Sequence, residues 1–344
     1  MTRPAVLKPN AVGLTKADYG GRPSTLCKGC GHNAVANQIV QVAFDLGLAP
    51  SEIVKLSGIG CSSKSPAYFL GMSHGFNALH GRMPSIATGA LTAHHGLRAI
   101  GVSGDGDSGS IGLGQFKHLM RRNVRMVYLV ENNGVYGLTK GQFSPTAEDG
   151  LTLKYAGTNA FPPVDLCAEA LLSGAGFVAR GFAGDAKQLR ELLKAALSHR
   201  GTAVIDIVSP CVAFNNDEDS RHSYGYGRTN EVPLSDVGWV PPREDIVLDD
   251  HEPGETRVVE LHDGSRLALR KLEEGYDPGD PQRALARIHQ AETRGEVLTG
   301  LLYFDAARPN LAETLALGET PLAQLPDERL RPPPEALQRV LDRY

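Results

Sequence analysis

The stretch that decides the fold is residues 104–142, GDGDSGSIGLGQFKHLMRRNVRMVYLVENNGVYGLTKGQ. The apolar run AIGVSG ends at its first residue, and the β-branched and aromatic run VRMVYLVEN follows one helix length later. Continuous apolar runs of this kind are typical of strands that are buried on both faces. We therefore predict two parallel strands joined by a crossover helix at residues 110–122.

Polar residues stand at the ends of both predicted strands, Gly104-Asp105-Gly106 after the first and Asn132-Asn133 at the second. Ligands of open α/β sheets bind outside the carboxyl ends of the strands. The glycines let a phosphate approach the backbone, while Asp105 and Asn133 offer oxygen ligands for a divalent cation. A GDG triplet alone is common in turns, but the two oxygen ligands lie 28 residues apart, and this spacing favours a magnesium ion bound to a diphosphate.

The alternation of helix and strand continues on both sides of this stretch. A helical apolar pattern at residues 35–46 precedes the strand-like EIVKLSGIG, and PSIATGALTAHHGLRAI, which begins at Pro84, has the pattern of the next helix. Another helical pattern at residues 187–199 precedes the strand-like TAVIDIVSP. This order predicts a doubly wound α/β fold with a mostly parallel sheet.

The pattern divides the chain into three parts. Residues 1–20 are predicted to be an irregular N-terminal arm, and residues 21–215 to be the α/β domain. Residues 216–344 hold polar loops, the helical PQRALARIHQAETR, the strand-like EVLTGLLYFD and a proline-rich tail. We predict an irregular C-terminal extension that contacts another subunit, with no second catalytic domain.

Composition excludes several classes of partner. The 344 residues are 41% hydrophobic, which is enough for a substantial core, and the 39 acidic and 35 basic residues give a net charge of −4. A chain with this balance has no electrostatic surface for nucleic acid or an anionic membrane. The first twenty residues lack an apolar signal core, and no window approaches the roughly 20 apolar residues of a membrane span. The sequence predicts a cytoplasmic protein.

The five cysteines are better suited to metal ligation than to a disulfide framework, because a chain of this length needs no covalent cross-links. Cys27 and Cys30 stand two residues apart in CKGCGH. A Cys-x-x-Cys pair with two further thiolates suits both zinc and an iron-sulfur cluster, and the residues alone leave both metals open. Cys167 lies in the helical DLCAEALL and is predicted to be a small buried apolar residue.

Residues 104–142 resemble the thiamine diphosphate motif, GDG followed by NN, in the form found in the 2-oxoacid:ferredoxin oxidoreductases. CKGCGH, GIGCSS, HGRMPSIATG and SPC are similar to further motifs of that family's β subunit and occur in the same order. The resemblance covers about residues 20–215. It implies the diphosphate domain of the thiamine diphosphate-binding fold.

The resemblance also implies which residues bind the cofactor. Asp105, Asn133 and the backbone carbonyl of Val135 would bind magnesium. Residues at further motif positions would line the cofactor pocket: Ile59, Gly60, Cys61, Ser62, His80, Thr88, Gly89, Gly106, Asp107, Gly137 and Leu138. Glycine amides and a hydroxyl are suitable donors for a diphosphate.

The same family resemblance assigns the cysteines. Cys27, Cys30, Cys61 and Cys211 would bind one [4Fe-4S] cluster, which leaves Cys167 over. Zinc remains the alternative metal. The cluster is favoured because Cys61 lies in a glycine-rich strand end like the one that holds the cofactor, within electron-transfer reach of a thiazolium.

Four cationic side chains are candidates for catalysis and substrate binding. His80 and Arg82 fall between the cysteine and diphosphate motifs, and their alternative is a structural pair. Lys64 and Lys140 flank the two cofactor loops and could bind a substrate carboxylate or a coenzyme A phosphate. Solvated lysines are the alternative for both.

The family's activity is the reversible oxidative decarboxylation of a 2-oxoacid with coenzyme A, with electrons passed through the cluster to ferredoxin. The resemblance favours 2-oxoglutarate, giving succinyl-CoA and carbon dioxide, over pyruvate or another 2-oxoacid. It implies an obligate partner, the larger α subunit, whose pyrimidine-binding domain supplies a glutamate, in a dimer of αβ pairs. The alternatives are a non-oxidative thiamine diphosphate enzyme with structural zinc and an electron-transfer subunit with a degenerate cofactor site.

Overall fold

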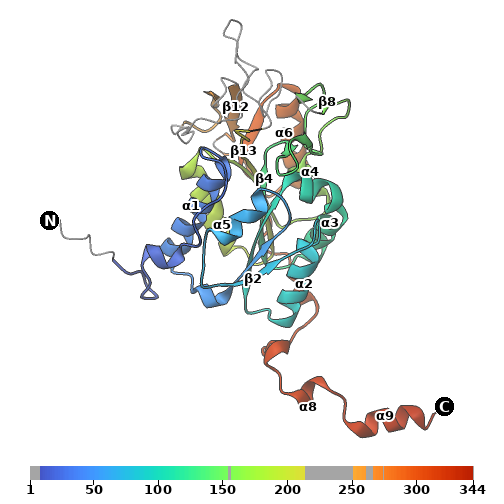
Figure 1. Cartoon of the computed structure of the whole chain (residues 1–344). Helices are drawn as coiled ribbons and strands as arrows, with labels where there is room; N and C mark the ends of the chain where they lie inside the picture. The colour runs from blue at the N-terminus through green and yellow to red at the C-terminus, as the bar shows by residue number, and fades with distance from the viewer. Residues whose placement is uncertain (1–7, 154–155, 214–250, 261–265, 274, 344) are drawn as a thin grey trace, which may run out of the picture.

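The computed structural model describes residues 8–153, 156–213, 251–260, 266–273 and 275–343 (Figure 1). Nine strands form one sheet in the order β11-β12-β13-β9-β10-β4-β3-β1-β2. Their bounds are β1 Ile53–Ser57, β2 His74–Asn77, β3 Arg98–Gly104, β4 Met126–Asn132, β9 Phe177–Phe182, β10 Thr202–Val208, β11 Thr256–Glu260, β12 Arg266–Lys271 and β13 Val297–Phe304. The run from β9 to β2 is parallel throughout, and β13 pairs antiparallel with β9. The predicted mostly parallel sheet is confirmed.

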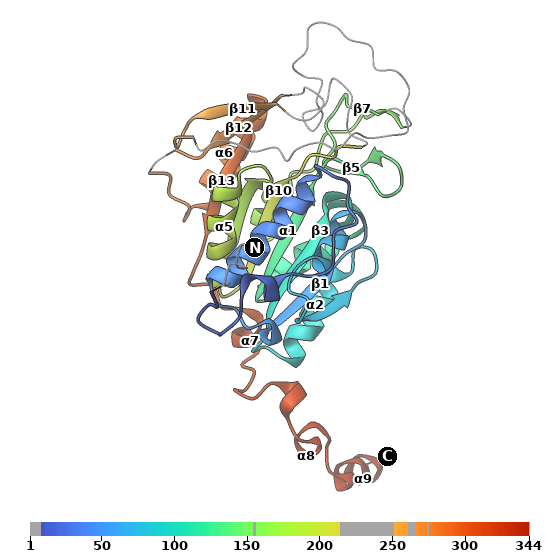
Figure 2. The same cartoon turned by 60° about the vertical axis from the view of Figure 1, so that its left-hand side comes forward.

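Helices cover both faces of the sheet (Figures 1 and 2). α1 (Gly31–Asp45) and α5 (Ala186–Ser198) pack on one face. The opposite face carries α2 Met83–Ala93, α3 Leu113–Arg122, α4 Leu166–Leu172 and α6 Pro281–Thr293. The doubly wound architecture predicted from the alternating pattern is therefore confirmed.

Strand β4 shows why the apolar runs are continuous. Met126, Tyr128 and Val130 face the core beneath α2 and α3, while Val127 and Leu129 face the core beneath α1 and α5. Side chains alternate across a strand, so a strand between two helical layers needs apolar residues at every position. Each such buried side chain contributes roughly 1.5–3 kcal/mol relative to exposure.

The C-terminal part differs from the irregular extension that we predicted. The predicted helix and strand exist as α6 and β13, but β13 and the unpredicted β11 and β12 continue the main sheet. The physical reason is the free edge of β9, which β13 covers by antiparallel pairing. Residues 214–250, where the predicted polar loop falls, lie outside the described residues.

The N-terminal arm is more ordered than predicted. It contains a short 3-10 helix, Lys16–Tyr19, whose last residue is fully buried. The hydroxyl of Tyr19 donates to the carbonyl of Leu48 at 2.7 Å and accepts from the amide of Asn10 at 2.8 Å. These bonds hold the arm against α1 and the segment that follows it.

The chain ends in short helical pieces: α7 Leu311–Thr314, the 3-10 helix Leu322–Gln324, α8 Asp327–Leu330 and α9 Pro334–Leu341. The 3-10 helix still contacts α2, where Gln324 hydrogen-bonds His94 at 2.9 Å, and beyond it the tail with α8 and α9 runs away from the body of the molecule (Figures 1 and 2). Among the described residues, none of the helices is both long and apolar enough to span a bilayer.

Candidate cofactor site

A cavity opens at the carboxyl ends of β1, β3 and β4, where the sheet is expected to bind a ligand. The loops after these three strands contribute most of its wall. The lining residues are Ile59, Gly60, Cys61, Ser62, His80, Gly104, Asp105, Gly106, Asp107, Glu131, Asn133, Val135, Tyr136, Gly137, Leu138 and Thr139. Most of the predicted cofactor and magnesium residues therefore meet in one place, although they lie up to about 80 positions apart in the chain.

At two glycines of this wall a larger residue would strain the backbone or displace a neighbouring side chain. Gly60 has φ 125°, a backbone conformation that L side chains rarely adopt. A Cβ on Gly106 would collide with Cε1 of Tyr136, whose hydroxyl donates to the Gly106 carbonyl at 3.0 Å. Gly106 thus allows the Tyr136 ring to pack on this loop, whereas the space beside Gly60 is open to a close approach by a phosphate.

Asp105 is oriented by three donors, all of which bind the same oxygen. Its Oδ2 accepts from the backbone N–H of Gly134 at 3.0 Å, the hydroxyl of Ser144 at 2.5 Å and the hydroxyl of Thr146 at 2.6 Å. Oδ1 accepts no hydrogen bond from the described residues, and the carboxylate lines the cavity. A buried carboxylate with one fixed oxygen and one open oxygen fits a magnesium ligand.

Asn133 and Val135 complete an oxygen donor set on the same wall. Asn133 is buried and its Oδ1 accepts from the backbone N–H of Val135 at 3.1 Å. A carboxylate, an amide oxygen and a backbone carbonyl are the ligands that magnesium takes in diphosphate sites. The residues present therefore fit the cation that the sequence implies.

His80 and Asp107 form a second polar pair on the cavity wall. The Nδ1 atom of His80 contacts Oδ1 of Asp107, which also accepts from the backbone N–H of Gly81 at 2.7 Å. The other carboxylate oxygen accepts from the Ser103 hydroxyl at 2.6 Å. Asp107, in the segment that follows β3, thus connects that segment to the loop that precedes α2 and fixes the imidazole of His80 at the cavity.

The four predicted cluster cysteines occupy the same end of the molecule. Burial raises the pKa of the Cys30 thiol, and the neighbouring Cys211 and Cys27 raise it further. Burial also raises the pKa of Cys61, which lies near Cys27, whereas Lys64 lowers it. All four are free thiols. Their proximity suits a shared thiolate-bound metal, which would also stabilise the deprotonated form of each buried thiol.

The thiols are not arranged as a preformed metal site. The part of the chain that the structure describes contains no group of three His, Cys, Asp or Glu side chains placed to hold a metal ion. Cys167, in contrast, is buried in α4 away from the others, with its Sγ donating to the Ala179 carbonyl at 3.5 Å. Its predicted role as a small buried residue is confirmed.

Sequence reasoning missed Glu131, a fully buried carboxyl on the cavity wall. Both of its oxygens accept from the Ser65 hydroxyl, at 3.1 and 3.0 Å, and His32 Nδ1 lies 3.4 Å from Oε2. Burial raises its pKa well above the usual range. The signal in the sequence was a charged residue near the end of an apolar strand, directly before the asparagine pair.

His32, which belongs to CKGCGH, is buried and donates to or accepts from the Ser209 hydroxyl at 2.6 Å. Burial lowers the pKa of His32 to about 4, so its ring is neutral at pH 7. It packs between the end of β10 and Glu131. The structure thus places His32 beside the cysteines and not on the cavity wall.

The cavity does not include every predicted residue. Thr88 and Gly89 lie on α2, where the Thr88 hydroxyl donates to the Pro84 carbonyl at 2.8 Å. The exposed Arg82 caps the start of α2, and the exposed Lys140 follows the wall residues Leu138 and Thr139. Lys140 has φ 77°, and a non-glycine residue held in this strained region is a pointer to function.

Comparisons with known proteins agree with this geometry. Residues 58–207 match the family described as thiamine pyrophosphate enzyme, C-terminal TPP binding domain. The 2-oxoacid:ferredoxin oxidoreductase subunit beta of Saccharolobus solfataricus is 43% identical over 191 residues, which are 55% of this chain and 63% of that protein. The 2-oxoglutarate oxidoreductase subunit KorB of Mycobacterium tuberculosis is 43% identical over 194 residues, 55% of this chain and 51% of that protein. The matched stretch thus spans less than two thirds of either relative.

Two further matches cover more of the related protein. The 2-oxoglutarate synthase subunit KorB of Methanocaldococcus jannaschii is 35% identical over 196 residues, 56% of this chain and 71% of that protein. A solved structure of 2-oxoglutarate:ferredoxin oxidoreductase from Magnetococcus marinus, with 2-oxoglutarate, coenzyme A and succinyl-CoA bound, is 31% identical. It superposes with a TM-score of 0.70 over 91% of each chain.

Proposed function

Because this chain belongs to the family of 2-oxoacid:ferredoxin oxidoreductase β subunits, we propose that it carries the redox half of such an enzyme. Its reaction is the reversible, coenzyme A-dependent oxidative decarboxylation of 2-oxoglutarate to succinyl-CoA and carbon dioxide. The observation that carries the proposal is the cavity at the ends of β1, β3 and β4, whose wall holds Cys61 together with most of the predicted diphosphate and magnesium residues.

Thiamine diphosphate, when bound, supplies the carbanion and the electron sink that decarboxylation of a 2-oxoacid requires. The side chain of Asp105, with Asn133 and the carbonyl of Val135, would hold magnesium against the diphosphate. The open backbone at Gly60 would receive the phosphate oxygens. The buried wall would exclude water, which would otherwise compete for the acyl group.

Cys27, Cys30, Cys61 and Cys211 would hold a [4Fe-4S] cluster, which accepts single electrons and passes them to ferredoxin. Cys61 supports this role because it lines the cofactor cavity and lies within electrostatic reach of Cys27. One side chain therefore connects the two centres. A structural zinc in the same thiolates would leave that connection without a purpose.

The substrate is proposed from the relatives and from the available cations. Two relatives are named for 2-oxoglutarate, and the solved structure of Magnetococcus marinus holds that substrate. 2-Oxoglutarate carries a second carboxylate that pyruvate lacks. Lys64, which lies near Cys61, and Lys140, which follows the wall residue Thr139, would bind this carboxylate, with Arg82 and His80 as further candidates.

The partner is an α subunit that carries the pyrimidine-binding domain, in a dimer of αβ pairs. To test the function, this chain is co-expressed with its α subunit, purified anaerobically and assayed with ferredoxin, coenzyme A and 2-oxoglutarate, pyruvate or branched 2-oxoacids. We expect the highest kcat/KM with 2-oxoglutarate and no activity from this chain alone. Full 2-oxoacid oxidation by the isolated chain would refute the partner requirement.

Replacement of Lys140 by Met is expected to raise the KM for 2-oxoglutarate by about 10-fold to 100-fold, because a charged hydrogen bond to a carboxylate contributes about 1.5–3 kcal/mol. Thiamine diphosphate content should not change. Steady-state kinetics of the αβ complex measure this. The control is Lys194→Met on α5, where the lysine pairs with Glu191 at the surface. Equal KM values for Lys140→Met and the unaltered complex would show that Lys140 does not bind the substrate.

A further inference from the structure

We propose that Asn132 and Thr146 are positioning residues for the magnesium-binding carboxylate of Asp105. The ion pairs of Arg180 with Asp206 and Asp165 hold Asn132 in place. The inference rests on the proposed magnesium and diphosphate site. It adds to that site a buried polar chain that runs from Asp105 across β4, β10 and β9.

The first link joins Asp105 to Asn132 through shared donors. The hydroxyl of Thr146 lies 2.6 Å from Oδ2 of Asp105 and 2.9 Å from Oδ1 of Asn132. The backbone N–H of Gly134 likewise lies 3.0 Å from Oδ2 of Asp105 and 3.4 Å from Oδ1 of Asn132. Two of the three groups that orient the Asp105 carboxylate are therefore located by the amide oxygen of Asn132.

The second link fixes which way the Asn132 amide faces. Its Nδ2 donates to Oδ1 of Asp206 at 3.1 Å, so its oxygen must face Thr146 and Gly134. Asn132 ends β4, and Asp206 stands two positions before Val208, its direct partner on β10. Such diagonal neighbours are within reach of each other across two strands. A rotated amide would turn its N–H₂ group toward the Gly134 N–H and its oxygen toward the Asp206 carboxylate, and both of these hydrogen bonds would be lost.

The third link immobilises Asp206. Arg180 on β9 is its direct cross-strand partner, and the guanidinium Nε donates to Asp206 Oδ2 at 3.0 Å. Nη2 of Arg180 donates to Asp165 Oδ2 at 2.7 Å, and Asp165 caps the start of α4 through Ala168 N–H. Arg180 and Asp206 are both buried. Two charged hydrogen bonds from one buried guanidinium limit the rotamers of both Arg180 and Asp206.

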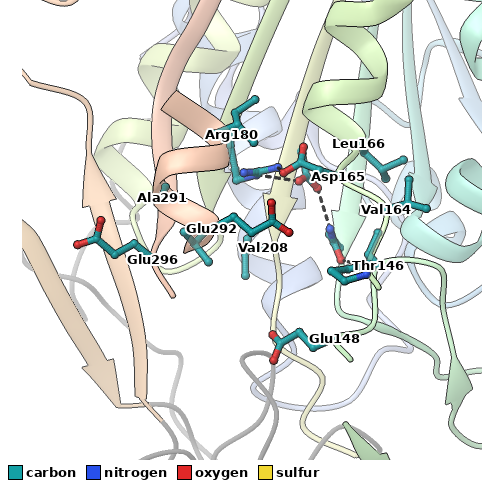
Figure 3. Close-up of a pocket in the computed structure, with 15 residues that line it drawn as sticks. Thr146, Glu148, Val164, Asp165, Leu166, Arg180, Val208, Ala291, Glu292 and Glu296 are labelled. Atoms are coloured by element: carbon teal, nitrogen blue, oxygen red, sulfur yellow. Dashed lines mark hydrogen bonds and ion pairs between the residues drawn. The ribbon is translucent and has the colours of Figure 1, made fainter. Parts of the chain in front are cut away.

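The polar side chains from Asn132 to Asp165 line a second cavity, and residues of α6 form another part of its wall. Figure 3 shows Arg180 and Asp165 pointing toward one another, with the dashed interactions continuing to Thr146. The side chains of Glu292 and Glu296, from α6 and the turn after it, lie across the cavity from Thr146 (Figure 3). The polar chain thus begins at the cofactor cavity, which Asp105 lines, and its other members line the second cavity.

The consequence concerns metal affinity. Without the hydroxyl of Thr146, Asp105 loses one of its three donors and keeps Ser144 and the Gly134 N–H. Without the amide of Asn132, Thr146 and Gly134 lose the acceptor that locates them beside Asp105. Groups that orient a metal ligand typically change metal affinity by about 10-fold to 100-fold when they are removed. Magnesium should therefore bind more weakly while the fold persists.

The test measures the apparent Kd for Mg²⁺ of the anaerobic αβ complex by titration at a fixed, saturating concentration of thiamine diphosphate. Thr146→Val removes the hydroxyl without a change in shape, and Thr146→Ser retains the hydroxyl. Asn132→Ala is the second test variant. Thr202→Val is the matched control, because Thr202 is buried at the opposite end of the sheet and donates to the Val124 carbonyl at 2.7 Å.

We expect Thr146→Val and Asn132→Ala to raise the Kd for Mg²⁺ about 10-fold or more, Thr146→Ser to restore it, and Thr202→Val to leave it unchanged. Excess Mg²⁺ should restore thiamine diphosphate binding in the first two. If both variants only lower the midpoint of thermal unfolding, as Thr202→Val does, and keep the original Kd, the positioning role is wrong and the proposed function stands. If the unaltered complex shows no Mg²⁺-dependent thiamine diphosphate binding, the proposed function itself fails.

Discussion

Replacement of Asp105 by Asn is expected to abolish activity and to weaken thiamine diphosphate binding by roughly 100-fold or more. The change removes the only charge that the proposed magnesium ligands contribute. It also places an amide N–H₂ group where Oδ2 now accepts from Gly134, Ser144 and Thr146, or at the open position that faces the cavity. Removal of a group that only orients a metal ligand typically lowers metal affinity by about 10-fold to 100-fold. Loss of the charged ligand itself should lower the affinity further.

The measurement is the dissociation constant of thiamine diphosphate in the anaerobic αβ complex, with and without Mg²⁺. Asp149→Asn is the control, because Asp149 is an exposed carboxylate in the segment that follows Thr146. Magnesium should strengthen binding in the unaltered complex and in the control. Unchanged, Mg²⁺-dependent binding by Asp105→Asn would show that another group holds the cation.

Replacement of Cys30 by Ser is expected to remove the iron-sulfur cluster and all electron transfer to ferredoxin. Cys30 precedes α1 in a buried position, and its thiol lies within electrostatic reach of Cys27, Cys211 and Glu131. A serine hydroxyl is a poor iron ligand at neutral pH because it does not ionise, whereas iron stabilises the cysteine thiolate. We expect Cys30→Ser to lose the whole cluster and all electron transfer, and not only a fraction of either.

Cys167→Ser is the matched control for this experiment. Cys167 is equally buried, but it packs in α4 beside Ala179 and takes no part in the proposed cluster. We expect that variant to lose about 1 kcal/mol of stability while its iron content and visible absorption persist. Iron retained at full stoichiometry in Cys30→Ser, or lost from Cys167→Ser, would reassign the cluster ligands.

The sequence predicted the central part of the fold because this part obeys simple rules. β3, β4 and β10 are continuous apolar runs since both of their faces are covered, and the glycines and asparagines at their ends mark where ligands bind. Edge strands give no such signal. β2 is exposed at every position, and β11 and β12 carry charged residues, so none of the three was predicted.

β9 was not predicted, for a different reason. Arg180 stands in its middle, and a charged residue in a buried strand contradicts the usual pattern until its partners are known. Those partners, Asp165 and Asp206, come from a helix cap and from another strand. Glu131 escaped attention in the same way, because only the fold brings Ser65 and His32 to it.

Within the site, sequence motifs predicted the loops better than the side chains of the neighbouring helix. Ile59 to Ser62, Asp105 to Asp107, and Asn133 with Val135 to Leu138 lie on the cavity wall because each set belongs to a loop that follows a strand. Thr88 and Gly89 belong to a motif of the same family resemblance, yet they lie on α2 and are not among the residues that line this wall. A helix presents only part of its circumference to a site, and the motif does not specify which part.

The central claim is that thiamine diphosphate and an iron-sulfur cluster occupy adjoining sites of this chain. The most direct measurement is a metal and cofactor inventory of the αβ complex purified without exposure to oxygen. We predict about four iron atoms, about four sulfides and one thiamine diphosphate with magnesium for each copy of this chain. Zinc in place of iron, or iron without thiamine diphosphate, would contradict the account.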